Sequence, residues 1–320
     1  MNDILVPLKL IHILSDGELY SGKYLGELLE MSLVGIKKHI QTIRDWGLDV
    51  FPVTGKGYRL PEPMQFLDEN IIRATLPGNN ISVLPFIDST NQYLLDRLDS
   101  LNSGDVCVAE YQHAGRGRRR RQWQSPFGAN LYLSMFWRLE QGGAAAAVGI
   151  SLAIGIVIAE VLHRLGAHDV KVKWPNDLYM HDRKLAGILV ELLEKTGDSA
   201  QLVIGIGINL WMRPSSGQDV TQEWINLQEA GIEIDRNILG ATLIAELGNA
   251  LEAFEQEGLR SFISRWRAMD NYYNCPVKLI IGEREIQVIE RGIDEKGALL
   301  LEEDGEIKSY LGGEISLRGK

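Results

Sequence analysis

The sequence predicts an α+β protein composed of three folded units. One reason is length: a single hydrophobic core stops growing at about 250–300 residues, so a chain of 320 residues is expected to divide. Another is the order of the predicted elements, which begin as helices with a hairpin, continue as mixed strands and helices, and end as short strands alone. The composition, 45% hydrophobic and 24% charged, is typical of soluble globular proteins.

Residues 1–63 are predicted to form a winged helix-turn-helix. Ser21 and Ser32 are each placed to cap a helix, and only a short turn separates the two helices. Short apolar runs flank the glycine-rich residues 54–57, which predicts a hairpin with Lys56 at its tip. This order of elements is typical of a DNA-binding unit.

Charge divides this first unit into two halves. Residues 1–30 contain two lysines and five acidic residues, whereas residues 31–60 contain five basic and two acidic residues. The basic half should face an acidic partner, and the second helix of such a motif enters the major groove of DNA. The residues expected to contact DNA are Ser21, Gly22, Ser32, Leu33, Val34, Lys37, Lys38, Gln41, Arg44 and Lys56.

Residues 64–270 are predicted to form a central sheet domain. The prolines at residues 61–63 can continue neither a helix nor a central strand, so we expect a linker there. Hairpins outnumber crossovers between the expected strands, which favours a mixed or antiparallel sheet over a doubly wound parallel one. The strands are expected at residues 83–87, 106–109, 131–138, 170–174, 184–194 and 201–209, and helical spacing returns at 237–268.

One uncharged stretch of this domain, residues 142–159, approaches the roughly 20 apolar residues that a membrane span requires. Ser151 interrupts it, Glu160 follows it, and its later apolar residues recur at helical spacing. We therefore expect a buried helix and no membrane partner.

Residues 271–320 are predicted to form a small β-barrel, because short strands alternate with turn signals at residues 282–283, 294–297 and 304–305. Cys107 and Cys275 lie far apart in the sequence, which argues against a disulfide framework and a structural zinc site. The N-terminus has no secretory signal pattern. These features favour a reducing cytoplasm.

Residues 113–123 contain five arginines, two glycines and no acid, in a chain of net charge −10. Glycine lets the main chain approach a ligand closely, and arginine offers planar bidentate donors, so this stretch suits a phosphate group. A solvated basic loop without a ligand is the alternative. No P-loop is present. The dinucleotide fingerprint is incomplete, because Arg120 stands where its third glycine would be needed.

Five motifs follow one another in the order found in biotin protein ligases, at residues 88–91, 112–118, 173–177, 184–189 and 205–209. With the predicted DNA-binding unit before them and the barrel after them, the chain resembles the bifunctional form, biotin ligase and biotin operon repressor, over essentially its whole length. The resemblance implies a central domain similar to class II synthetases and an SH3-like C-terminal barrel.

The resemblance also implies a reaction in two steps. Biotin and ATP, with Mg²⁺ on the phosphates, give biotinyl-5'-adenylate and pyrophosphate, and the biotinyl group then passes to a lysine of the biotin carboxyl carrier protein of acetyl-CoA carboxylase. The first step joins two anions, so cationic groups should supply most of the catalysis. Arg118, Lys184 and Asp177 match the family's catalytic positions. From the sequence alone, Lys184 could be a surface hairpin lysine and Asp177 a turn cap.

The remaining ligand contacts are carried over from the family position by position. Those implied for biotin are Ser89, Thr90, Asn91, Gln112, Arg116, Gly117, Arg118, Lys184, Gly187, Leu189 and Gly205. Those implied for ATP and the adenylate are Gly115, Arg116, Arg118, Arg119, Arg121, Trp123, Asn176, Lys184, Asn209 and Arg318. Protein ligands for Mg²⁺ are not identified. Without the family, a Ser-Thr-Asn sequence such as residues 89–91 is more often a helix cap than a ligand site.

The resemblance implies that the adenylate-bound protein forms a homodimer that binds operator DNA. Three departures bear on this expectation. Leu33 stands where family regulators generally have arginine, Gly35 weakens its helix by up to about 1 kcal/mol relative to alanine, and Arg120 removes a glycine from the basic loop. A repressor that senses a small anionic ligand without ligase activity, and a lipoate ligase, are the alternative functions.

Overall fold

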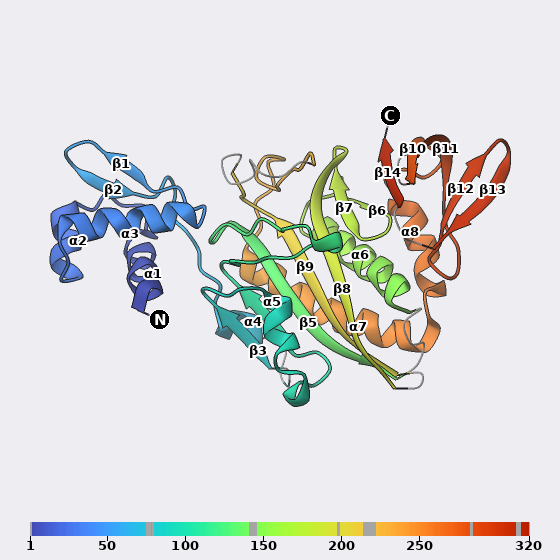
Figure 1. The fold of residues 1–320 in the computed structure, drawn as a ribbon, viewed down its shortest axis with the longest axis horizontal. Coiled ribbons are helices and arrows are strands. Elements are labelled where there is room, and N and C mark those ends of the chain that lie inside the picture. The colour runs from blue at the N-terminus through green and yellow to red at the C-terminus, as the bar shows by residue number, and fades with distance from the viewer. Residues whose placement is uncertain are drawn as a thin grey trace.

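The computed structural model describes residues 2–74, 78, 80–140, 146–196, 199–213, 222–281, 284–311 and 315–319. Three groups of elements follow one another along the chain: helices with a two-stranded sheet, a seven-stranded sheet with helices, and a five-stranded sheet. Figure 1 shows the first and last groups on opposite sides of the central sheet. The predicted α+β class is confirmed.

The first group is the expected winged helix-turn-helix. Ser21 Oγ accepts from the backbone N–H of Tyr24 at 3.1 Å, and Ser32 Oγ accepts from that of Gly35 at 3.1 Å, so both predicted caps form. A third helix, α1, precedes the expected pair. The bounds are α1 Asn2–Leu14, α2 Gly22–Leu28, α3 Leu33–Asp45, β1 Phe51–Val53 and β2 Gly57–Arg59, with Lys56 in the turn between the two strands.

The central sheet has the order β3-β4-β5-β9-β8-β7-β6. Only β3 and β4 run parallel, which confirms the mixed sheet. Strand β7 is missing from the sequence expectations, because four residues after a proline turn give too short a pattern. The bounds are β3 Ile81–Leu84, β4 Val106–Ala109, β5 Asn130–Leu139, β6 Lys171–Lys173, β7 Asp177–Met180, β8 Arg183–Thr196 and β9 Ser199–Asn209.

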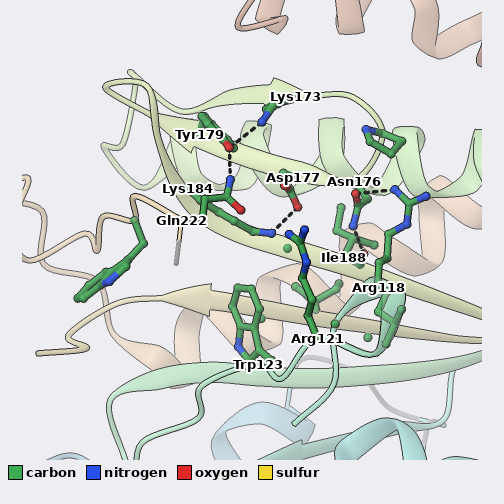
Figure 2. Close-up of a pocket in the computed structure, with 18 of the residues that line it drawn as sticks. Arg118, Arg121, Trp123, Lys173, Asn176, Asp177, Tyr179, Lys184, Ile188 and Gln222 are labelled. Atoms are coloured by element: carbon green, nitrogen blue, oxygen red, sulfur yellow. Dashed lines mark hydrogen bonds and ion pairs between the residues drawn. The ribbon is translucent and has the colours of Figure 1, made fainter. Parts of the chain in front are cut away.

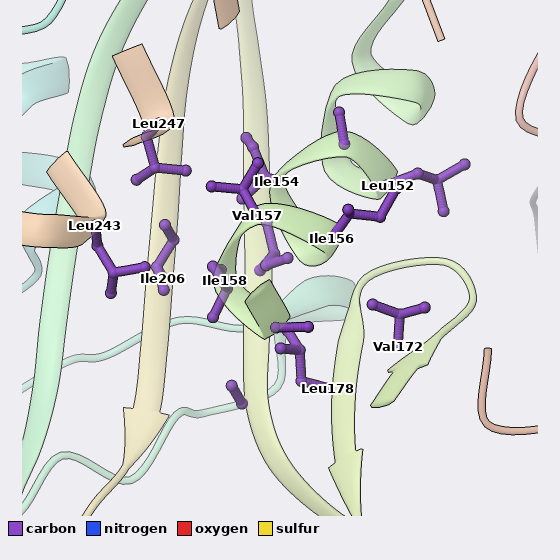
Figure 3. Close-up of a cluster of buried hydrophobic side chains, with 14 of the residues drawn as sticks. Leu152, Ile154, Ile156, Val157, Ile158, Val172, Leu178, Ile206, Leu243 and Leu247 are labelled. Atoms are coloured by element: carbon purple, nitrogen blue, oxygen red, sulfur yellow. The ribbon is translucent and has the colours of Figure 1, made fainter. Parts of the chain in front are cut away.

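Helices α6 (Ala146–Arg164) and α7 (Arg236–Glu257) pack together against one face of this sheet. Figure 3 shows apolar side chains of α6, Ile206 of β9, and Leu243 and Leu247 of α7 in one cluster. Helix α6 is long and apolar enough to cross a membrane, but 67% of its window Ala147–Arg164 is buried in the protein, as expected of a core helix. Residues 142–145 of the predicted helix lie outside the described residues.

Helix α7 is longer than α6, and the other helices of the central domain are shorter than both. Helix α5 contacts β4, β5 and β9. The bounds are α4 Glu69–Ala74, α5 Thr90–Leu95, α6 Ala146–Arg164, α7 Arg236–Glu257 and α8 Ile263–Met269, with 3₁₀ turns at Leu98–Ser100, Arg118–Arg120 and Arg260–Phe262.

The C-terminal sheet is antiparallel throughout, in the order β13-β12-β11-β10-β14, which confirms the small all-β unit. Gly297 and Gly305 adopt φ of +79° and +84° in two of the predicted turns, where a β-carbon would be strained. The bounds are β10 Pro276–Ile281, β11 Arg284–Ile293, β12 Leu299–Glu303, β13 Glu306–Tyr310 and β14 Ile315–Gly319.

Aromatic side chains join the first unit to the central domain. The ring of Trp46 lies 5.1 Å from Phe86, 5.7 Å from Tyr111 and 6.1 Å from Phe127, measured between centroids. The backbone N–H of Phe127 donates to the carbonyl of Trp46 at 2.8 Å. The helix that ends at Asp45 is therefore fixed against the segment that leads into β5.

Two buried carboxyl groups meet where the central domain joins the C-terminal sheet. The carboxyl groups of Asp270 and Glu290 are close enough for their charges to interact. Burial, followed by the neighbouring Asp270 charge, raises the pKa of Glu290 to about 8, so the pair holds one proton at neutral pH. Glu290 Oε1 accepts from the backbone N–H of Gly292, which leaves Oε2 as the oxygen that can hold this proton.

The shared proton predicts a stability that depends on pH. The folded-state pKa of Glu290 lies above its ordinary value of 4.5, so its stabilisation is full below pH 4.5 and is lost as pH rises through about 8. Between these two pH values the free energy of unfolding should fall by up to roughly 1.4 kcal/mol for each pH unit. Glu290→Gln, which stays neutral, should flatten this slope in urea unfolding. The exposed Glu306→Gln is the control, and an unchanged slope in Glu290→Gln would contradict the assignment.

Candidate active site and DNA-binding surface

Three glycines of the β8–β9 hairpin form a flat floor on the sheet face that α6 and α7 leave open. Gly187 pairs directly with Gly207, and Gly205 lies two residues earlier on β9. Side chains alternate along a strand, so Ile188 and Ile206 point into the core while the glycines face the other way. A cavity of about 1240 Å³ lies over this floor.

Two side chains from elsewhere in the chain occupy the space that the glycines leave. A β-carbon on Gly207 would lie 2.5 Å from the Trp123 ring, and one on Gly205 would lie 2.3 Å from Asn91 Oδ1. Contacts this short do not occur in proteins, so larger residues at these positions would displace Trp123 or Asn91. The positions of Trp123 and Asn91 therefore require glycine at residues 207 and 205.

One end of the cavity is lined by a buried polar network. Gln112 Oε1 accepts from the backbone N–H of Thr90 at 2.9 Å, while Gln112 Nε2 donates to Ser125 Oγ at 2.9 Å. The hydroxyl of Ser134 donates to Asn91 Oδ1 at 2.5 Å. Buried polar groups in such a network hold one another in fixed orientations. Ser125 and Ser134 are absent from the expected site, since isolated serines give no signal in the sequence.

Glu191 ties this network to the basic loop. It accepts from Asn91 Nδ2 at 2.7 Å and from Arg116 Nη2 at 3.1 Å, both at Oε2. Glu191 lies on β8 on the same face as Gly187 and Leu189, at spacing two. That period was the one signal by which sequence reasoning could have included it.

The basic loop is folded over the cavity through its own backbone. The N–H of Gly117 donates to the carbonyl of Arg121 at 2.8 Å, and that of Trp123 to the carbonyl of Gly115 at 2.8 Å. Arg119 has the left-handed φ of +57°. Arginine in place of the usual glycine at residue 120 therefore needs no left-handed conformation, because the left-handed residue is its neighbour Arg119.

Arg118 reaches from this loop to the opposite wall, where Nη1 donates to Asn176 Oδ1 at 3.0 Å (Figure 2). Desolvation lowers the pKa of Arg118, and the nearby Asp177 carboxylate partly offsets that effect. Arginine remains protonated at neutral pH even so. Its charge is therefore available to an anion in the cavity.

Lys184 and Asp177 face each other across two neighbouring strands, with Nζ 2.7 Å from Oδ1 (Figure 2). The register of β7 and β8 shifts between Leu178 and Tyr179, so that β8 has one extra residue there. A bulge of this kind turns a side chain to the other face of the sheet. It brings Lys184 to the face of Gly187, where a β-carbon would lie 3.4 Å from Nζ.

The Lys184–Asp177 pair is partly shielded from solvent, with exposed side-chain fractions of 20% and 15%. It is an ion pair rather than an aligned hydrogen bond, because Oδ1 has no partner of hydrogen-bond geometry. Beyond it, Lys173 Nζ donates to the hydroxyl of Tyr179 at 2.7 Å (Figure 2). Positive charge therefore continues along this wall.

The structure brings together most of the ligand residues that the sequence predicts. Those that line the cavity are Ser89, Thr90, Asn91, Gln112, Arg116, Gly117, Arg118, Arg119, Arg121, Trp123, Asn176, Asp177, Lys184, Gly187, Leu189 and Gly205. Gly115 does not line it. It allows the loop to close, since a β-carbon there would lie 2.6 Å from the carbonyl oxygen of Trp123.

Two predicted nucleotide contacts have other outcomes. Asn209 is buried and does not line the cavity, and its Nδ2 donates to the carbonyl of Ile225 at 3.2 Å, so its contact with the nucleotide stays a prediction. Arg318 lies in β14 opposite Lys278, and its side chain is outside the described part of the chain. Within the described residues, no group of three metal-ligating side chains occurs.

The DNA-binding surface keeps most of its predicted residues exposed. Lys37, Lys38 and Lys56 are exposed. Gln41 is exposed too, although its Nε2 donates to Asp45 Oδ1 at 2.9 Å. Arg44 is half-buried, and its Nε and Nη2 both donate to the Val50 carbonyl, at 3.0 and 2.7 Å. Its guanidinium therefore fixes the chain after α3, and its contact with a DNA phosphate stays a prediction.

Gly207→Ala should push the Trp123 ring off the floor, because the new β-carbon would overlap it. Iodide quenching of tryptophan fluorescence should increase relative to the parent protein, with Trp123→Phe identifying the contribution of this residue. Gly248→Ala in α7 meets nothing within 4 Å and is the matched control. Equal quenching in Gly207→Ala and the parent would show that the ring is not held against Gly207.

Comparison with known proteins gives a consistent relationship over the whole chain. Residues 83–209 match the biotin/lipoate A/B protein ligase family, residues 274–318 the biotin protein ligase C terminal domain, and residues 8–59 an HTH domain. The bifunctional ligase/repressor BirA of Escherichia coli is 66% identical over 318 residues, which cover 99% of each chain. That of Bacillus subtilis is 28% identical over 310 residues, 94% of each chain.

Solved structures agree with this relationship. The biotin protein ligase of Aquifex aeolicus, in complex with biotin and ATP, matches with a TM-score of 0.64 and 29% identity. The match covers 75% of this chain and 99% of that one. Taken with the near-complete coverage of the E. coli protein, it shows that this chain belongs to the biotin protein ligases, in their bifunctional ligase/repressor form.

Proposed function

We propose that the cavity activates biotin with ATP and then transfers the biotinyl group to a lysine of a biotin carboxyl carrier protein. One observation carries this proposal: a buried polar network and a set of cationic side chains line the same glycine-floored cavity. The first suits a neutral ring with amide-like edges, and the second suits phosphates.

The polar network is suited to the ureido ring of biotin. Thr90, Asn91 and Gln112 are buried and hold one another in place, so their donors and acceptors keep a fixed arrangement. A site of this kind discriminates strongly against analogues without matching polar groups, because its own groups would then be left unpaired.

The adenylate step joins a biotin carboxylate oxygen to the α-phosphorus of ATP, and the bond to the β-phosphate oxygen breaks to release pyrophosphate. Lys184 would leave Asp177 to contact both anions, which a loosely aligned ion pair permits. Arg118 would neutralise the phosphate from the opposite wall. The charges are already positioned before the reaction, so little reorganisation is needed as negative charge develops.

In the transfer step, the amine of the acceptor lysine attacks the acyl carbon and AMP leaves with its phosphate oxygens. The amine loses a proton to water on forming the amide. Asp177, released from Lys184, would orient that amine. Mg²⁺ would accompany ATP, where it reduces the charge of the β- and γ-phosphates.

The repressor half of the proposal is a homodimer of the adenylate-bound form that binds the operator. A two-fold dimer would present two copies of α3 to two half-sites. A repressor that only senses biotin is the alternative. The retained Arg118, Lys184 and Asp177, assembled in one cavity, favour a working ligase over that alternative.

The proposal predicts that the protein, incubated with biotin, MgATP and a biotin carboxyl carrier domain, adds one biotinyl group to the carrier and releases pyrophosphate. Intact-mass spectrometry of the carrier and a pyrophosphate assay follow the two steps separately. Lipoate in excess should not compete with biotin. If neither assay gives a signal at any biotin concentration, the repressor without ligase activity is favoured. If lipoate competes effectively, a lipoate ligase is favoured.

Lys184→Ala should lower the rate of adenylate formation by on the order of 10²–10³, as removal of one preorganised electrostatic contact does in other enzymes. Pyrophosphate release in a single turnover measures this rate. Lys296→Ala, on an exposed turn of the C-terminal sheet, should behave as the parent protein does. Near-normal turnover of Lys184→Ala, with an unchanged circular dichroism spectrum, would remove Lys184 from the chemistry.

A further inference from the structure

Helix α3 begins with two exposed apolar side chains. Leu33 is 56% exposed and Val34 is 77% exposed, directly after the cap residue Ser32. Neither takes part in the core of the first unit, for which α3 has other residues. The buried residues of α3 are Ile36, Ile40 and Ile43.

The surroundings of these two side chains are basic. Lys37 and Lys38 are exposed at the i+3 and i+4 positions from Val34, and so lie on its side of the helix. The result is an apolar pair with two cationic groups on the same side of the helix, and these groups complement the charge of a nucleic-acid backbone.

Leu33 also lies close to the preceding helix. A β-carbon on Gly22, the first residue of α2, would lie 3.3 Å from Leu33 Cδ2, so Leu33 packs near the start of that helix. Val34 is more exposed than Leu33. On the same first turn, Leu33 is therefore partly covered by α2 and Val34 extends further into solvent.

We propose that Leu33 and Val34 read thymine through its C5-methyl group in the major groove of the operator. This inference rests on the proposed repressor function. In a helix-turn-helix, the N-terminal residues of the recognition helix contact base edges. Neither side chain has a hydrogen-bond donor or acceptor, and the apolar feature of a major-groove edge is the thymine methyl.

The lysines have a different task in this arrangement. Contacts to phosphates fix the register of the helix but carry no base information. Sequence preference at the first turn would then depend on methyl groups alone, so that each half-site has thymine where the helix enters the groove. Loss of one contacted methyl should weaken binding about fourfold, the worth of one buried carbon.

The test uses the full chain with biotin and MgATP. Duplexes are first enriched from a random-sequence pool, and each thymine of the enriched duplex is then replaced by deoxyuridine, which lacks only the methyl group. Fluorescence anisotropy at constant salt measures the affinities. The parent protein should lose about fourfold at one or two positions of each half-site.

Two variants assign that loss to residues. In Val34→Ser, the difference between thymine and deoxyuridine should vanish at one position, and in Leu33→Ser at a neighbouring one. Lys38→Gln is the matched control: it should weaken binding to all duplexes alike, reduce the salt slope by about 1, and keep the methyl effect. Thermal unfolding of each variant excludes a folding defect.

The inference is overturned if deoxyuridine binds as thymine does, or if the methyl effect persists in both serine variants. It is also overturned if Val34→Ser changes self-association of the ligand-free protein in sedimentation while duplex preference stays the same, since the apolar turn would then be an interface between copies. If the parent enriches no duplex, the repressor proposal itself fails. Sequence-selective binding without a methyl effect removes only the thymine assignment.

Discussion

The absence of side chains at three positions of the β8–β9 hairpin is the constraint on which the site depends. Without it, Trp123 and Asn91 could not lie against the sheet, because β-carbons at Gly207 and Gly205 would occupy their places. Asn91 belongs to the polar network and donates to Glu191, and Trp123 belongs to the basic loop, where its N–H donates to the carbonyl of Gly115. The sheet thus provides a rigid surface, and the loops provide the chemistry.

Both peripheral units are joined to the central domain by buried contacts as well as by the chain. Phe127 packs against Trp46 of the first unit, and Ser125, two residues earlier, binds the side chain of Gln112 in the cavity. The segment 125–127 therefore touches the DNA-binding unit and the polar network together. On the other side, the proton shared by Asp270 and Glu290 lies between the central domain and the C-terminal sheet.

Two predicted ligand contacts belong to side chains that have backbone partners in the structure, for local geometric reasons. Arg44 has the right spacing for an outward face of α3, but the turn after the helix places the Val50 carbonyl within its reach. Asn209 ends a strand whose glycines face the cavity, yet its own side chain is held by the Ile225 carbonyl. In both cases the side chain donates to a backbone oxygen of a residue elsewhere in the chain. Periodic patterns in a sequence carry no information about such contacts.

The sequence by itself determined the three units, the caps of the DNA-binding helices, the mixed sheet, and the residue types that gather in the cavity. Periodicity, capping and motif order are local properties, and they survive without knowledge of contacts. Only the tertiary structure decided that Lys184 faces Asp177, because a bulge reverses the direction expected from strand alternation. It also decided the roles of Glu191, Ser125 and Ser134. Their hydrogen-bond partners come from other segments of the chain and meet them only in the folded domain.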